Sequence, residues 1–221
     1  MPSLIEIYYN PKNHRYHYKD TNRFVPEIVV QRLTQQTISD GISDLKVIGN
    51  LLEDNKISLT TWQETTAKTL RQIHTQQYLL NRGGRKQMTE EDWLILKRNI
   101  KNEFKLLRNF ASDINNGYTV DSKGRQQVLT TAKFRARLNL YGKATQLSAK
   151  LGHQQAKLKS NVQYVAMQRF LGATDKHCSS CLSYASAGIR PLGGLPLPGS
   201  DCECRANCLC RVKYYSVAEI S

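Results

Sequence analysis

Apolar residues recur at three- and four-residue steps through much of this chain, a pattern that predicts amphipathic α-helices. One such run follows Pro26 and continues to an Asp-Asn-Lys break at residues 54–56. A second begins near Ser58 or Thr60, whose hydroxyl groups suit a helix N-cap, and ends at the glycine pair 83–84. The pattern therefore predicts two long helices joined by a short turn.

The clearest helical pattern follows Thr89. The segment 89–92, Thr-Glu-Glu-Asp, resembles a capping box with Asp in place of Glu. The apolar stripe behind it consists of Trp93, Leu96, Ile100, Phe104, Leu107, Phe110 or Ala111, and Ile114. The Asn-Asn-Gly sequence at 115–117 ends this third helix. Trp62 and Trp93 both lie on apolar stripes, so we expect both to be core anchors rather than platforms for stacked bases.

A fourth helix is predicted after a short linker, starting at Thr130 or Thr131. Its apolar face consists of Phe134, Leu138, Tyr141, Leu147 and Leu151. His153 follows on the same helix, and we expect it to be a packed or solvent-facing side chain rather than a ligand.

Short β elements are predicted at both ends of the chain. Residues 4–24 alternate aromatic positions around an Asn-Pro turn, which indicates a hairpin that packs on the helical body or on a neighbouring subunit. A strand from Val162 leads toward the first cysteine, the Gly/Pro-rich segment 188–199 is a loop, and a last strand covers 212–217. The fold class is therefore α+β: an N-terminal β-hairpin arm over 1–25, a body of long helices over 26–160, and a small Cys-rich β module over 161–221.

Charge is distributed unevenly. The chain has 32 Lys and Arg against 18 Asp and Glu, a formal net charge of +14, and no acidic residue between Asp121 and Asp175. The cations of this stretch are Lys123, Arg125, Lys133, Arg135, Arg137, Lys143, Lys150, Lys157, Lys159 and Arg169. Such like charges favour a polyanion or an acidic protein surface opposite them, the alternative being a solvated basic surface. No apolar run approaches the roughly 18 residues of a membrane span, and no signal peptide precedes the first helix, so we expect assembly in a host cytoplasm.

All six cysteines lie between Cys178 and Cys210. In a cytoplasm, clustered cysteines favour metal ligation over disulfides. Tetrahedral Zn²⁺ takes paired thiolates, so Cys178 and Cys181 form one pair, Cys208 and Cys210 the preferred second pair, with Cys204 in reserve and Cys202 as the spare. Three disulfides, or free thiols in an irregular pocket, are the alternatives. Zinc is preferred to an iron–sulfur cluster because nothing else in the sequence indicates redox chemistry.

These residues carry a resemblance. A strand with Cys178-x-x-Cys181, a Gly/Pro loop and a terminal Cys-x-Cys followed by residues 211–214, Arg-Val-Lys-Tyr, resembles the phage head morphogenesis family, the minor head proteins of tailed phages that include the F protein of phage Mu. The helix with Phe134-x-Ala-Arg-Leu and Tyr141-Gly is similar to the family's helical region, so the resemblance covers roughly residues 93–214. It implies a virion protein that associates with the portal or inner head and contacts packaged DNA, and a ligand set of Cys178, Cys181, Cys208 and Cys210. Two extra cysteines and the lack of His-Pro before the terminal Cys-x-Cys depart from the family pattern.

Nothing in the sequence indicates an enzyme. A cysteine nucleophile needs a nearby base, and of the five histidines only His177 touches the cysteine cluster. The acid-free basic stretch lacks the carboxylates of a metal-dependent nuclease, and no phosphate-binding loop is present. We therefore expect catalysis neither by thiol nor by metal.

The first hypothesis is a structural virion protein that docks on the portal or major capsid protein and binds duplex DNA without sequence preference. Its predicted DNA- or acidic-partner-binding residues are Lys133, Arg135, Arg137, Lys143, Lys150, Lys157 and Lys159. The alternatives are a neck, tail or outer-shell component of the virion, and a zinc-module DNA-binding regulator. The regulator needs a recognition helix beside the metal, which the Gly/Pro density between Cys181 and Cys202 disfavours.

Overall fold

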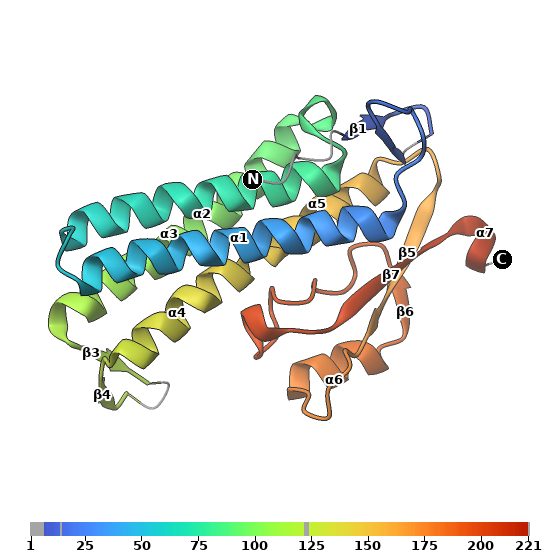
Figure 1. The fold of residues 1–221 in the computed structure, drawn as a ribbon. Coiled ribbons are helices and arrows are strands. Elements are labelled where there is room, and N and C mark those ends of the chain that lie inside the picture. Colours follow the sequence, from blue (N-terminus) through green and yellow to red (C-terminus); the bar gives the residue numbers. More distant parts are fainter. Residues whose placement is uncertain (1–6, 14, 122–123, 221) are drawn as a thin grey trace.

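The computed structural model describes residues 7–13, 15–121 and 124–220, and its fold is α+β, as the sequence predicts. Long helices lie side by side, and a small sheet with its loops packs along one flank (Figure 1). The body consists of α1 (Glu27–Glu53), α2 (Leu59–Arg82), α3 (Glu90–Asn116), α4 (Thr131–Ala144) and α5 (Gln146–Leu158), with the 3-10 turn η1 (Arg85–Gln87). The remaining elements are β1 (Ile7–Asn10), β2 (Arg15–Tyr18), β3 (Tyr118–Val120), β4 (Gln126–Val128), β5 (Tyr164–Phe170), α6 (Ser179–Ser186), β6 (Ile189–Pro191), η2 (Arg205–Asn207), β7 (Arg211–Ser216) and α7 (Val217–Ile220).

Helix limits follow the capping residues that the sequence indicates. The hydroxyl of Ser58 accepts a hydrogen bond from the Thr61 amide at the start of α2, and Gly83 ends that helix in the left-handed region at φ 100°. At the start of α3 both hydrogen bonds of the capping box are present, with Asp92 accepting from the Thr89 amide and Thr89 from the Asp92 amide. Three of the predicted helices are therefore confirmed as α1, α2 and α3.

The predicted fourth helix is instead two helices, and the linker before it is a hairpin. The buried Thr145 separates α4 from α5, and its hydroxyl donates to the Gly142 carbonyl at 2.6 Å. Periodicity alone cannot detect this break, because the apolar positions on either side keep helical spacing. The linker forms the antiparallel pair β3–β4, with Tyr118 opposite Val128.

An aromatic cluster forms the centre of the body. Trp62 of α2 lies 6.0 Å from the ring of Phe110 and 5.9 Å from that of Phe134, and Phe110 lies 6.0 Å from Tyr141. All four side chains are buried, together with Leu45 of α1. The core thus contains residues of four helices, and these contacts hold α4 against the longer helices.

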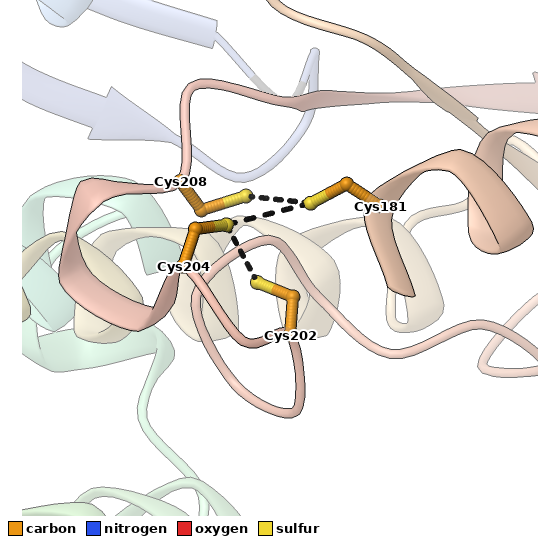
Figure 2. Close-up of side chains that lie close together, drawn as sticks. All are labelled: Cys181, Cys202, Cys204 and Cys208. Atoms are coloured by element: carbon orange, nitrogen blue, oxygen red, sulfur yellow. Dashed lines mark hydrogen bonds between the residues drawn. The ribbon is translucent and has the colours of Figure 1, made fainter. Parts of the chain in front are cut away.

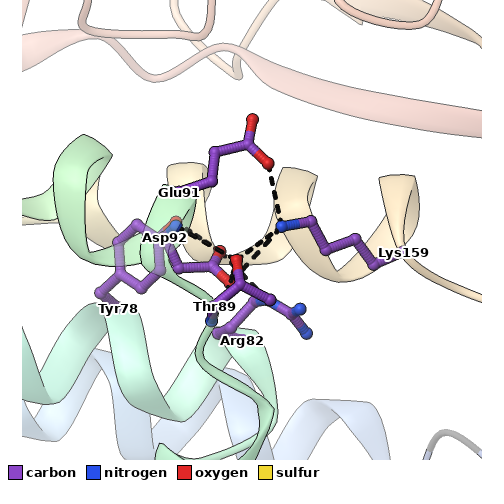
Figure 3. Close-up of polar contacts among 6 residues, drawn as sticks. All are labelled: Tyr78, Arg82, Thr89, Glu91, Asp92 and Lys159. Atoms are coloured by element: carbon purple, nitrogen blue, oxygen red, sulfur yellow. Dashed lines mark hydrogen bonds and ion pairs between the residues drawn. The ribbon is translucent and has the colours of Figure 1, made fainter.

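Trp93 does not anchor the core. It is 38% exposed, with the Arg85 guanidinium 5.6 Å above its ring, whereas the adjacent Asp92 is fully buried. Asp92 accepts hydrogen bonds from Tyr78 at 2.9 Å and from Arg82 at 3.1 Å (Figure 3). The prediction that Trp93 anchors the core was wrong. The buried ion pair between Asp92 and Arg82 fixes the start of α3, and Trp93, the first apolar residue of the helix, does not.

The N-terminal hairpin packs on the helical body. Tyr16 donates from its hydroxyl to the Leu80 carbonyl of α2, and the Tyr9 ring lies against Gly83. The rings of Tyr9 and Tyr16 meet edge to face at 5.3 Å. The hairpin is confirmed from Ile7 onward, and residues 4–6 and 14 of the predicted segment lie outside the described part of the chain.

The C-terminal sheet has the antiparallel order β6-β5-β7. Its central strand buries Met167 completely against Leu195 and Leu197 of the Gly/Pro-rich loop. The strand predicted from Val162 is confirmed as β5, and the strand predicted over 212–217 is confirmed as β7, except that Val217 begins α7. Segment 188–199, predicted to be a loop, contains the short strand β6, and the helix α6 was not predicted. Among the described residues, no helix is long and apolar enough to cross a membrane.

Candidate metal centre

Strand pairing brings the two ends of the cysteine module together. Phe170, the last residue of β5, lies opposite Arg211, the first residue of β7. The chain after β5 therefore runs beside Cys210, and it then places Cys178 at the N-cap of α6 and Cys181 in its first turn. The remaining cysteines lie around η2, with Cys202 and Cys204 before it and Cys208 directly after it.

The thiol groups converge on one point. The Sγ atoms of Cys181, Cys202, Cys204 and Cys208 all lie within 4.8 Å of one another, an arrangement that could hold a metal ion (Figure 2). Cys204 lies 3.4 Å from both Cys181 and Cys202, and Cys181 lies 3.7 Å from Cys208. These separations far exceed the roughly 2.05 Å of a disulfide. They are close to the edge of a zinc–thiolate tetrahedron, about 3.8 Å for Zn–S bonds of about 2.3 Å.

A buried arginine faces this cluster. Arg169 of β5 is only 1% exposed, and its Nη2 donates to the Sγ atoms of Cys181 at 3.3 Å and Cys208 at 3.2 Å. Its guanidinium also lies 4.9 Å from the Tyr184 ring. A buried cation needs a buried anion beside it, and thiolates are the anions that this pocket supplies. The guanidinium also donates to the Pro196 carbonyl at 3.2 Å, and ionised sulfur, the form that binds metal, would compensate its charge.

Lys150 of α5 is a second cation at the cluster. Its Nζ donates to the Pro198 carbonyl at 2.9 Å. Burial lowers the pKa of Lys150, and the neighbouring sulfur of Cys208 opposes that shift. The helical body thus supplies positive charge to the module, and Lys150 is a contact between the two.

The thiols differ in their surroundings. A hydrogen bond with the Ser180 hydroxyl, at 3.4 Å, is the main cause that lowers the pKa of Cys178 to about 6. Burial raises the pKa of Cys181 instead. For Cys208 and Cys210, burial raises the pKa but hydrogen bonds with neighbouring groups outweigh it, so that both are lowered.

The structure brings the predicted ligands together, with one residue added. Cys181, Cys204 and Cys208 belong to the group of four, whereas Cys178 and Cys210 lie at its edge. Cys202, expected to be the spare, is a member of the group and is 2% exposed. Its position could not be predicted from spacing, because the Gly199 amide donates to its Sγ at 3.3 Å and turns the loop inward.

The buried position of Arg169 has a signal in the sequence. Met167 and Arg169 are two residues apart on β5, so both side chains point to the same face of the strand. Met167 is fully buried, and an arginine in register with such a residue must be buried and paired. An inward arginine next to a cysteine cluster indicates an anionic site.

The predicted basic residues do not form one exposed face. Lys133 bonds to the Val128 carbonyl at 3.0 Å, and Arg135 pairs with Glu53 at 3.0 Å, both on the surface near the start of α4. Contacts within the protein engage the others: Arg137 over the Phe110 ring, Lys143 with Asn207, Lys150 with Pro198, Lys157 with Tyr164, and Lys159 with Glu91. Most of these link the helical body to the C-terminal module or to α3.

Other polar groups are enclosed in the body. His74 lies 2.8 Å from the Ser148 hydroxyl, which also accepts from Asn99 at 2.9 Å. His74 and Ser148 are fully buried, so no substrate can reach this Ser–His pair. His153 is packed, as expected, with its ring stacked 5.4 Å from Tyr214.

A cavity of about 530 Å³ lies between the helical body and the cysteine loop. Glu103 lines it, and burial raises the pKa of this carboxyl to about 7. Cys204 lines the same cavity, so one face of the thiol cluster adjoins it.

Comparison with known proteins identified no relative of this chain. No protein-family model matches the chain, no curated protein matches it, and no solved structure matches its fold.

Proposed function

We propose that this protein is a structural component of a tailed-phage particle, a minor head protein that docks on the portal or major capsid protein, with structural zinc in its cysteine module. The observation that supports the proposal is the joint placement of the residues behind the family resemblance. Cys178, Cys181, Cys208 and Cys210 meet in one module closed by the β5–β7 pair. Phe134 and Tyr141 of the similar helix lie in the core of the adjoining body.

Zinc has a structural role in this proposal. The loops 171–178 and 192–210 converge on the thiol cluster, and beyond Leu195 and Leu197, which pack on Met167, these loops contribute few buried apolar side chains. A structural zinc site contributes on the order of 10 kcal/mol to the folding of a small module. Arg169 and Lys150 compensate the negative charge that a thiolate–zinc centre keeps.

Contact with DNA is proposed for the exposed start of α4. Lys133 and Arg135 are exposed there even though they contact Val128 and Glu53, whereas the lysines of α5 are half-buried and bond to groups of the C-terminal module. Binding through phosphates ignores base sequence and weakens steeply as salt increases.

The DNA contact is tested with duplex DNA in mobility-shift titrations at increasing salt. The variant Lys133→Gln/Arg135→Gln should bind more weakly and with a shallower salt slope than a matched variant, Lys97→Gln/Lys101→Gln, which removes two exposed charges from α3. Equal loss in both variants would assign DNA affinity to net charge rather than to this surface. Sequence-selective binding that survives high salt would favour a DNA-binding regulator instead.

The virion assignment is tested by gradient sedimentation of particles from cells that produce the phage, with the chain followed by mass spectrometry. A minor head protein stays with the heads after tails are removed, and resists protease while the particle is intact. Cleavage on intact particles would favour a neck, tail or outer-shell position. A chain that stays at the top of the gradient would refute the virion assignment.

A further inference from the structure

Two cysteines remain when four thiols are assigned to one metal ion. Cys178 and Cys210 lie outside the group of four, yet neither is remote from it. The Sγ of Cys178 is 3.6 Å from that of Cys204, and Cys210 is buried in the same cluster as Cys181, Cys202 and Cys208. Both extra thiols therefore extend the same cluster, and a single tetrahedral ion leaves them without a function.

Cys181 and Cys204 occupy the middle of this cluster. Their Sγ atoms are 3.4 Å apart; Cys204 also lies 3.6 Å from Cys178 and 3.4 Å from Cys202, and Cys181 lies 3.7 Å from Cys208. The other four cysteines lie around this central pair: Cys178, Cys202, Cys208 and Cys210. Two central and four peripheral sulfurs are the arrangement of a Zn₂Cys₆ centre, in which two thiolates bridge two ions. Two four-coordinate ions need eight ligand positions, and six thiolates supply them when two are shared.

Charge is compatible with this arrangement. Six thiolates with two Zn²⁺ ions carry about two net negative charges, and the buried Arg169 and the half-buried Lys150 are two cations at the cluster. One ion with four thiolates carries the same net charge, so charge does not separate the two cases. The positions of Cys178 and Cys210 distinguish one ion from two, because only a second ion would be bound by these two thiols.

We propose that the six cysteines bind two zinc ions that share Cys181 and Cys204 as bridging ligands. Cys202 and Cys208 complete the first ion, and Cys178 and Cys210 complete the second. The inference deepens the zinc site of the proposed function and rests on metal binding there. It is independent of where the protein lies in a particle.

The first test is metal content of the full chain, purified under reducing conditions without chelator, together with a count of thiols that react with an alkylating agent. Two zinc ions per chain and protected thiols are expected. In cadmium-substituted protein, two NMR resonances coupled to each other through shared sulfur are expected. One zinc ion with two reactive thiols would overturn the second site and leave the first. Absence of metal, or iron in its place, would overturn the zinc proposal as well, while sedimentation with particles would still decide the virion assignment.

Single substitutions provide the matched comparison. Cys178→Ser and Cys210→Ser should each lower the zinc content from two ions to one. With a single ion held by the group of four, these two variants would keep all their zinc, whereas Cys202→Ser would lose it. Cys204→Ser should lose both ions, because it removes a ligand from each. If a variant fails to fold, the cadmium spectrum of the unmodified protein still decides, since a single resonance is incompatible with two ions.

Discussion

The carboxylate of Asp92 accepts hydrogen bonds at the place where three helices meet, and replacing this residue by alanine removes that acceptor. Its carboxylate accepts hydrogen bonds from Tyr78 and Arg82 of α2 and from the amide of Thr89, which caps α3. Lys159, at the end of α5, lies 3.8 Å from the same carboxylate (Figure 3). The substitution therefore leaves a buried guanidinium and a buried phenol without their partner and removes half of the capping box.

The magnitude follows from burial. Asp92 is 0% exposed and Arg82 is 5% exposed. Removing one partner of a buried ion pair costs roughly 3–5 kcal/mol, because the other charge stays buried and unpaired. We expect Asp92→Ala to lower the free energy of unfolding by about 4 kcal/mol, or the Tm by roughly 8–16 °C in a chain of this size.

The pair also has a pH dependence. Burial opposes the ionisation of Asp92, but hydrogen bonds from Thr89 and Tyr78 and the Arg82 guanidinium outweigh it and lower the pKa of this carboxyl. A lowered folded-state pKa stabilises the protein above the unfolded value of about 3.9, and this contribution is lost as the pH falls through the folded value. The difference in stability between wild type and Asp92→Ala should therefore shrink in strong acid.

The assay is urea unfolding followed by far-ultraviolet circular dichroism, which reports the helices. Glu91→Gln is the matched control, because it removes the adjacent acid that pairs with Lys159 at 3.0 Å, with side chains 64% and 28% exposed. Such a surface pair contributes at most about 1 kcal/mol. Equal losses for the two variants would refute the argument. So would a double variant Asp92→Ala/Arg82→Met whose loss equals the sum of the single losses, because partners in a buried pair must couple.

Three further predictions concern the body. Trp62→Ala should lower the free energy of unfolding, measured by urea unfolding, by about 3–5 kcal/mol, because Trp62 is fully buried. Trp93→Ala should lower it by much less, and equal losses would contradict the exposed placement of Trp93. Gly152→Ala should lower the Tm more than Gly142→Ala. The Cβ added at position 152 would lie 2.5 Å from the Tyr78 carbonyl oxygen, whereas the Cβ added at position 142 meets only the movable side chain of Ile42. The reverse order of Tm values would contradict this reasoning. Burial lowers the pKa of His74 to about 4, so its contribution is present above the unfolded value of about 6.5 and is lost as the pH falls toward 4. Urea midpoints at pH 7 and pH 5 should therefore differ less in His74→Gln than in wild type.

Local signals in the sequence predicted the elements well. Ser58, Thr89 and Gly83 each place a helix end where the structure has it, because capping depends on residues within a few positions. The break at Thr145 depends on tertiary packing instead. Gly142 and Gly152 allow α4 and α5 to approach α1 and α2 closely, and their partners lie far away in the sequence.

The candidate site was predictable as a cluster but not as a ligand set. Spacing identified Cys178 and Cys181 as a pair, since both lie at one helix end. It could not rank Cys202, whose inward position depends on a loop hydrogen bond from Gly199. Nor could it find Lys150, because this residue reaches the module only after the helical body and the sheet have packed together.

The acid-free stretch illustrates how sequence distance misleads an argument from charge. The absence of Asp and Glu between 121 and 175 suggested cations without partners and hence an external polyanion. In the folded chain, Arg135 meets Glu53 of α1, Lys159 meets Glu91 of α3, and Arg169 meets cysteine sulfurs from α6 and the loop after η2. Partners from distant segments thus compensate part of this charge, and the thiol cluster supplies some of the missing negative charge once its cysteines are ionised. A DNA contact must therefore depend on cations that stay exposed even where they have a partner, as Lys133 and Arg135 do at the start of α4, and the Lys133→Gln/Arg135→Gln variant tests for it.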